Sequence, residues 1–161
     1  MLRLKKFLKG IIDVVKINFV CFGNICRSPM AEFVMKNLVQ NAGVEKNFLI
    51  ESSGCHPAVG TPIHHNSCRE LKKNNVPFTK RTSKRFTEET YKNFDYIICM
   101  DRNNVYDAKR ISGRDPEGKI YLLLEFAGEN RDVDDPYYTE NYSIAYADIL
   151  RGCQALLKSL T

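Results

Sequence analysis

Short apolar runs alternate with amphipathic stretches along most of this chain. Runs rich in β-branched and aromatic residues predict four strands, at 17–21, 48–53, 94–101 and 119–125. Apolar residues at helical spacing predict helices at 28–43, 64–75 and 140–158. Nearly all-apolar strands that alternate with helices are typical of a parallel sheet covered on both faces. The pattern therefore predicts an α/β fold, a three-layer sandwich with a four-stranded parallel sheet flanked by helices.

The first predicted helix has clear start and stop signals. Ser28 is expected to be its N-cap, Pro29 its first helical residue, and Gly43 the residue that ends it. The helix follows the first strand after only a short loop. Because ligands of open parallel sheets bind at the carboxyl ends of the strands, we expect the functional site at this loop.

The N-terminus differs from the rest of the chain. Apolar residues of segment 1–15 follow helical spacing with basic residues between them, which predicts a basic amphipathic extension. We favour packing on the body or fraying over contact with a membrane. The remaining residues, 16–161, are predicted to form one domain, because this length is typical of a single core.

Composition narrows the class of protein. The chain is 43% hydrophobic and 27% charged, which is ordinary for a globular protein, and no apolar run is long enough to span a membrane. It has six cysteines without a secretory signal or the Cys-x2-Cys spacing of a zinc site, so we expect reduced thiols, a cytoplasmic location and no metal.

The net charge of +5 is unevenly distributed, with basic residues gathered in segments 1–16 and 69–85. Such clusters favour an anionic partner without identifying it. They lack the interleaved aromatic residues of a stacking surface, so we expect no nucleic-acid binding.

The loop after the first strand, within "FVCFGNICRS", combines features that bind an anion. Gly23 permits a tight turn whose amides converge on an anion, and the N-terminus of the next helix adds positive potential. Arg27 supplies a planar cationic fork that matches two phosphate oxygens. The sequence therefore predicts a phosphate-binding loop after the first strand.

Cys21 begins this loop and is the candidate nucleophile. A cysteine surrounded by amide donors, a helix N-terminus and a guanidinium is expected to exist largely as the thiolate, placed for in-line attack on phosphorus. Ser28 is expected to donate its hydroxyl to the sulfur, and the amide of Asn24 to hold the loop in shape. The alternative is a buried cysteine at a strand end and an arginine on a surface helix.

The stretch "VCFGNICRSPMAE" resembles the active-site loop of the low-molecular-weight protein tyrosine phosphatases, at every defined position. The resemblance covers roughly residues 16–160. It implies hydrolysis of phosphotyrosine or small aryl phosphates through a cysteinyl phosphate, without a cofactor, and inhibition by phosphate and similar oxyanions. It places the substrate against a group of loop residues: Phe22, Gly23, Asn24, Ile25, Cys26 and Ser28.

The reaction also needs a general acid, and two Asp-Pro pairs are candidates. Asp115 lies in "GRDPEGK", whose glycine and proline content predicts a plain turn. Asp135 lies in "VDDPYYTE", just before the last helix, and its proline fixes the backbone beside the carboxyl group. The resemblance selects Asp135, and Tyr137 and Tyr138 are then expected to line the pocket.

Three further expectations follow from the resemblance. Cys26 is expected to form a reversible disulfide with Cys21, the alternative being a small apolar loop residue. Asp101, after the third strand, is expected to have a structural role. His56 and Pro57 are the candidate second wall of the pocket, where the family commonly has a bulky residue such as tryptophan; this chain has no tryptophan.

Related activities remain as alternatives. Arsenate reductases of similar fold add a closely spaced pair of downstream cysteines, which this chain lacks. Protein arginine phosphatases have threonine at the position of Ile25 and lack the paired tyrosines. A non-catalytic phosphate-binding module needs neither a thiolate nor an acid. Together, Cys21, Arg27 and Asp135 favour a tyrosine phosphatase.

Overall fold

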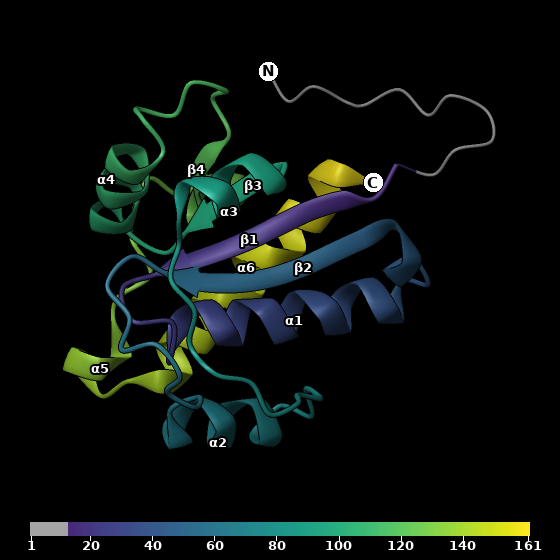
Figure 1. Ribbon diagram of the computed structural model, residues 1–161. Helices are drawn as coiled ribbons and strands as arrows, with labels where there is room; N and C mark the ends of the chain where they lie inside the picture. Colours follow the sequence, from purple (N-terminus) through teal and green to yellow (C-terminus); the bar gives the residue numbers. More distant parts are fainter. Residues whose placement is uncertain (1–12) are drawn as a thin grey trace.

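A four-stranded parallel sheet lies at the centre of the structure, a computed structural model that describes residues 13–161 (Figure 1). Its order is β2-β1-β3-β4. The strands are β1 (Val15–Cys21), β2 (Phe48–Gly54), β3 (Tyr96–Cys99) and β4 (Ile120–Leu122). Since β1 has β2 on one side and β3 on the other, the strand order reverses at β1. The predicted α/β sandwich is confirmed.

Helices follow each strand. Within residues 13–161 they are α1 (Arg27–Asn41), α2 (His65–Lys73), α3 (Glu88–Asn93), α4 (Arg102–Ile111), α5 (Pro136–Thr139) and α6 (Tyr142–Leu160). Two 3₁₀ helices, η1 (Glu45–Asn47) and η2 (Leu123–Ala127), complete the set. The sequence analysis predicted α1, α2 and α6 but not α3, α4 and α5.

Alternate side chains of β1 point to opposite faces of the sheet and divide the core in two. Ile17 and Phe19 pack in a large cluster with residues of α1 and α6. Val20 packs on the other face, in a smaller cluster with Tyr91 of α3 and Ala108 of α4. This alternation is the period of a β-strand. Cys21 falls on the α1 and α6 face and is buried there.

The predicted start of the first helix is wrong. Helix α1 begins at Arg27, and Cys26 is its N-cap without a side-chain cap. Ser28 lies inside the first turn, and instead of capping the helix its hydroxyl accepts a hydrogen bond from Asn24 Nδ2 of the loop at 2.8 Å. Pro29 also fits the first turn, where its missing N–H has no helical partner to lose.

Two strand predictions were too long. The run 119–125 is a strand only as far as Leu122, and the chain then turns into η2, whose Leu123 and Leu124 are fully buried. Strand β3 ends at Cys99, and Asp101 starts α4 instead by accepting the N–H of Asn104 at 2.8 Å. An apolar run does not indicate where a strand ends and a helical turn begins, because buried strands and buried helical turns share the same composition.

The extension predicted over residues 1–15 lies almost wholly outside the described residues. Strand β1 already begins at Val15. Along residues 13–161, the structure has no helix that is both long and apolar enough to cross a membrane.

Candidate active site

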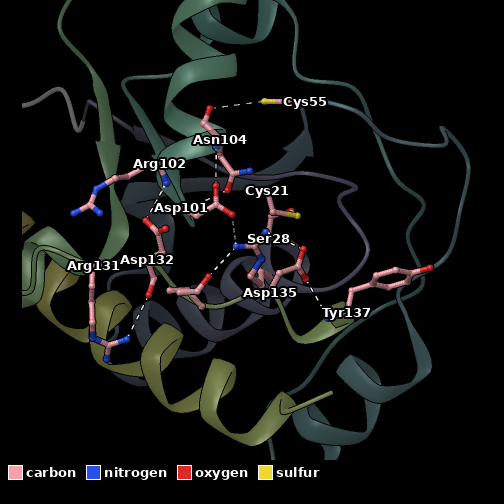
Figure 2. Close-up of polar contacts among 12 residues, drawn as sticks. Cys21, Ser28, Cys55, Asp101, Arg102, Asn104, Arg131, Asp132, Asp135 and Tyr137 are labelled. Carbon is pink, nitrogen blue, oxygen red and sulfur yellow. Dashed lines mark hydrogen bonds and ion pairs between the residues drawn. The ribbon is translucent and has the colours of Figure 1, made fainter. Parts of the chain in front are cut away.

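The loop from Cys21 to Arg27 joins β1 to α1 at the carboxyl edge of the sheet, where the strand order reverses. Cys21 is the last residue of β1, and its Sγ accepts the backbone N–H of Asn24 at 3.2 Å. The Oγ of Ser28 lies 3.0 Å from the same sulfur (Figure 2). The predicted pairing of Ser28 with Cys21 is therefore present in the structure.

Asn24 gives the loop its shape. It adopts a left-handed backbone, with φ 57°, which asparagine tolerates better than most residues. Its Nδ2 donates to Ser28 and to Ser52 Oγ, and its Oδ1 accepts from the backbone N–H of Lys84 and from the guanidinium of Arg81. Every polar atom of the side chain thus holds the loop, as predicted, but Arg81 had not been identified from the sequence.

The glycine that the loop requires is Gly54 rather than Gly23. A Cβ on Gly54 would lie 2.7 Å from the Phe22 carbonyl oxygen and 2.9 Å from the Asn24 backbone nitrogen. A Cβ on Gly23 would meet only the Ile25 side chain, at 3.9 Å, and Gly23 has no positive φ. The tight position is therefore on β2, where the loop backbone crosses the strand end.

We expect Gly54→Ala to lower the free energy of unfolding by about 1–3 kcal/mol, because the added methyl group must displace backbone atoms of the loop. Hydrolysis of an aryl phosphate should fall as well. Gly23→Ala is the matched control, with an unfolding free energy close to that of the wild type. Urea denaturation measures both; equal stabilities for the two variants would contradict this assignment.

Arg27 is buried, with 2% of its surface exposed, and is held by three acceptors from distant parts of the chain. Its Nη1 donates to Asp101 Oδ2 at 2.7 Å and to the carbonyl of Val133 at 2.8 Å, and its Nη2 donates to Asp135 Oδ2 at 3.2 Å. Burial by itself lowers the pKa of Arg27, but the nearby Cys21, Asp135 and Asp101 outweigh burial and raise it. The guanidinium is therefore a fixed cation beside Cys21.

Asp135 reaches the loop from a segment more than a hundred residues further along the chain. It is the N-cap of α5, where its Oδ1 accepts the N–H of Tyr137 at 3.1 Å (Figure 2). The alternative acid, Asp115, lies elsewhere and organises the turn before β4 by accepting the Tyr91 hydroxyl and the N–H of Lys119. The structure thus places Asp135, not Asp115, beside Arg27.

A cavity of about 350 Å³ opens above the loop. It is lined by Cys21, Phe22, Gly23, Ile25, Cys26, Arg27, Ala58, Thr61, Asp135, Tyr137 and Tyr138. All but Ala58 and Thr61 were predicted, while Asn24 and Ser28 lie beneath the loop as supports. The candidate nucleophile, cation, acid and aromatic walls thus meet in one cavity.

The second wall of the cavity was predicted too early in the sequence. His56 and Pro57 do not line the cavity. The ring of His56 packs on Phe22 with centroids 4.9 Å apart, and its Nε2 lies 2.9 Å from Asp107 Oδ2. Ala58 and Thr61 take the wall position with small side chains. No composition signal distinguishes these residues, because the backbone path of the loop decides which of them faces the cavity.

The other cysteines differ from Cys21 in their surroundings. Burial raises the pKa of Cys26 to about 11 and of Cys55 to about 12, and it raises the pKa of Cys99 and Cys153 as well. Cys26 Sγ also lies 3.5 Å from the Tyr142 hydroxyl. A thiol stays protonated below its pKa, so these four thiols stay in their less nucleophilic, protonated form at neutral pH.

We expect iodoacetamide at neutral pH to alkylate Cys21 before these four cysteines. Cys68 is partly exposed, so the experiment uses Cys68→Ser protein, in which mass spectrometry should find one modified residue. Phosphate should slow the reaction by occupying the cavity, and labelling of Cys26 should rise only as the pH approaches 11. Modification of Cys26 before Cys21 at neutral pH would contradict the assignment.

The chain matches known proteins over most of its length. The sequence model described as low molecular weight phosphotyrosine protein phosphatase matches residues 16–161. A protein named low molecular weight protein-tyrosine-phosphatase PtpA, from Staphylococcus aureus, is 38% identical over 146 residues, which cover 89% of this chain and 92% of that protein.

Two solved structures extend the similarity to the fold. YfkJ from Bacillus subtilis has a TM-score of 0.89 and 33% identity, covering 92% of this chain and 95% of that one. Wzb of Vibrio vulnificus, solved in complex with benzylphosphonate, has a TM-score of 0.81 and 29% identity, covering 91% and 99%. With its cysteine, arginine and aspartate gathered at one cavity, the chain belongs to the low-molecular-weight phosphotyrosine protein phosphatase family.

Proposed function

We propose that the chain hydrolyses phosphotyrosine in proteins, and small aryl phosphates, through a phosphoryl group carried on Cys21. One observation supports this most strongly: Cys21, Arg27 and Asp135 line the same cavity, although Asp135 is far away in sequence. A nucleophile, a fixed cation and a carboxyl group are what phosphoryl transfer to a cysteine needs.

In the first step, the phosphate oxygens accept hydrogen bonds from the loop amides and from Arg27. Cys21 Sγ attacks phosphorus, the ester P–O bond breaks, and the departing phenol oxygen takes a proton from Asp135. In the structure Asp135 accepts from Arg27 Nη2. A phosphate that takes over this hydrogen bond leaves the Asp135 carboxyl free to hold its proton.

In the second step, water attacks phosphorus and Asp135 accepts the proton of the water. The S–P bond breaks, the electron pair returns to Cys21, and inorganic phosphate leaves. Ser28 Oγ and the N–H of Asn24 both lie at hydrogen-bond distance from Cys21 Sγ and stabilise the departing thiolate. We propose that no cofactor takes part.

The rim of the cavity supports an aryl ester as substrate. Tyr137 and Tyr138 are largely exposed and lie edge to face with ring centroids 5.4 Å apart, and Phe22 stands on the loop side. Aromatic walls favour a flat ring in this arrangement. The benzylphosphonate bound to the related Wzb is consistent with such a ligand here.

The aromatic rim also argues for phosphotyrosine over the related substrates. Ile25 lines the cavity together with both tyrosines. A panel of a phosphotyrosine peptide, a phosphoarginine peptide and arsenate separates the three activities. We expect the highest kcat/KM for phosphotyrosine, competitive inhibition by inorganic phosphate, and no arsenate reduction. A preference for phosphoarginine would overturn the proposed substrate.

We also propose a cytoplasmic location for the enzyme. All six cysteines are free thiols in the structure, including the one that the mechanism requires. Free thiols persist in a reducing compartment, where a nucleophilic cysteine stays active.

A further inference from the structure

A second, larger hollow of about 680 Å³ adjoins the catalytic cavity and shares Tyr137 with it. It lies between the start of α2 and the segment that joins α5 to α6, two regions found at the same end of the molecule (Figure 1). One wall includes Asn66 and Arg69, and the other includes Thr139 and Ser143. We call it the α2 groove. The proposed chemistry does not use it.

The floor of the α2 groove is in contact with the catalytic loop. Tyr142, which lines the groove, has its hydroxyl 3.2 Å from His64 Nδ1 and 3.5 Å from Cys26 Sγ. The rings of Tyr142 and His64 stack with centroids 5.4 Å apart. A polypeptide with its phosphotyrosine in the catalytic cavity therefore has a continuous path over Tyr137 into the groove.

The charged groups of the α2 wall determine what this groove can bind. Glu70 is buried, and its carboxylate accepts hydrogen bonds from Ser143 Oγ and Asn74 Nδ2. Arg69 is exposed, and its guanidinium has no ion pair or hydrogen bond within residues 13–161. Burial and the neighbouring His65 lower the pKa of His64, which keeps that ring neutral at physiological pH.

The opposite side of the groove contains a carboxylate. Glu140 lies at the far rim, where it is exposed to solvent. Lys72 and Lys73 lie further along α2, in its last turn, and do not line the groove. Arg69 is the only arginine or lysine among the described residues that line the groove, and its planar fork is suited to bind a carboxylate.

We propose that the α2 groove binds the polypeptide next to the phosphotyrosine, with an acidic side chain of the substrate against Arg69. This inference rests on the proposed phosphotyrosine phosphatase function and deepens it. It predicts a preference among phosphoproteins that a small aryl phosphate does not reveal, because such a substrate ends at the aromatic rim.

The test compares three kinds of substrate: p-nitrophenyl phosphate, a phosphotyrosine peptide with neutral flanking residues, and peptides with glutamate on one or the other side. Arg69→Ala should lower kcat/KM for one acidic peptide by about 2- to 5-fold, as expected for loss of one exposed ion pair. It should leave p-nitrophenyl phosphate and the neutral peptide unchanged. Arg69→Glu should lower kcat/KM for the same acidic peptide further, and it should raise kcat/KM for a peptide that has lysine in place of the glutamate.

Lys46→Ala is the matched control. It removes the same charge from η1, at the start of β2 and so at the opposite end of the sheet from the groove. Equal losses for Lys46→Ala and Arg69→Ala, or equal losses for all peptides, would overturn the proposed contact while hydrolysis of phosphotyrosine continued. If the wild-type protein does not hydrolyse phosphotyrosine peptides at all, the proposed function is overturned, and this inference with it.

Discussion

Cys21→Ser is expected to lower kcat for p-nitrophenyl phosphate by about 10⁴-fold or more, the scale seen when a catalytic nucleophile is removed. Serine keeps the shape of the side chain, but its hydroxyl is far less ionised than a cysteine thiol at neutral pH. The loss should appear in kcat, since Cys21 makes its new bond only in the transition state. Steady-state kinetics with and without a chelator measures it.

Binding of the phosphate group should survive this substitution. Arg27 and the loop amides remain in place, so inorganic phosphate should still bind to Cys21→Ser protein in a calorimetric titration. Cys68→Ser is the matched control. Cys68 is a partly exposed thiol outside the cavity, so this variant should keep full activity. Substantial hydrolysis by Cys21→Ser would show that the sulfur is not the nucleophile.

Asp135→Asn is expected to lower kcat by about 10²- to 10⁴-fold, the usual contribution of a general acid or base. Asparagine retains an oxygen that can accept the N–H of Tyr137, so the start of α5 should be preserved. The loss should be larger for phenyl phosphate than for p-nitrophenyl phosphate, because p-nitrophenolate leaves readily without a proton.

Asp134→Asn provides the control, because this neighbouring carboxylate is exposed and does not line the cavity. It should change kcat little. Equal losses with the two leaving groups would indicate that Asp135 acts on the fold or on Arg27 rather than as the acid. Comparing two substrates on one variant therefore separates a chemical role from a structural one.

The site was predictable from sequence where its chemistry is local. Cys21, Asn24 and Ser28 lie within eight residues, and their contacts follow from a tight loop between a strand and a helix. Asp135 was selected from two Asp-Pro pairs only through resemblance to a family. Residue patterns favoured a plain turn at Asp115 but did not exclude it as the acid, because a turn and a catalytic loop can share the same composition.

The supports of the site depend on contacts that no local pattern encodes. Arg27 was predicted to bind phosphate, but Asp101 and the Val133 carbonyl were not identified as the groups that hold it. Arg81 donates to the carbonyl of Asn24 at 2.7 Å across 57 positions of sequence. Such pairs form when the order of strands in the sheet brings distant loops together. No single stretch of the sequence determines that order.

Missed helices have a similar physical cause. Helix α4 is polar over most of its length, and its packed face has only Val105, Ala108 and Ile111, which are few apolar residues from which to recognise a helix. Its start carried a usable signal, since Asp101 and Asn104 form a reciprocal capping box. Helix α5 spans only four residues, too few for any periodic pattern.

The central claim is that a phosphoryl group passes through Cys21, and trapping that species tests it most directly. Asp135→Asn protein is mixed rapidly with p-nitrophenyl phosphate, whose leaving group needs little acid, while the missing base slows attack by water. The mixture is quenched, digested and examined by mass spectrometry. The account predicts one phosphoryl group on the peptide that contains Cys21, formed with a burst of p-nitrophenol. Release of phosphate and p-nitrophenol together, with no phosphorylated cysteine at any time, would contradict it.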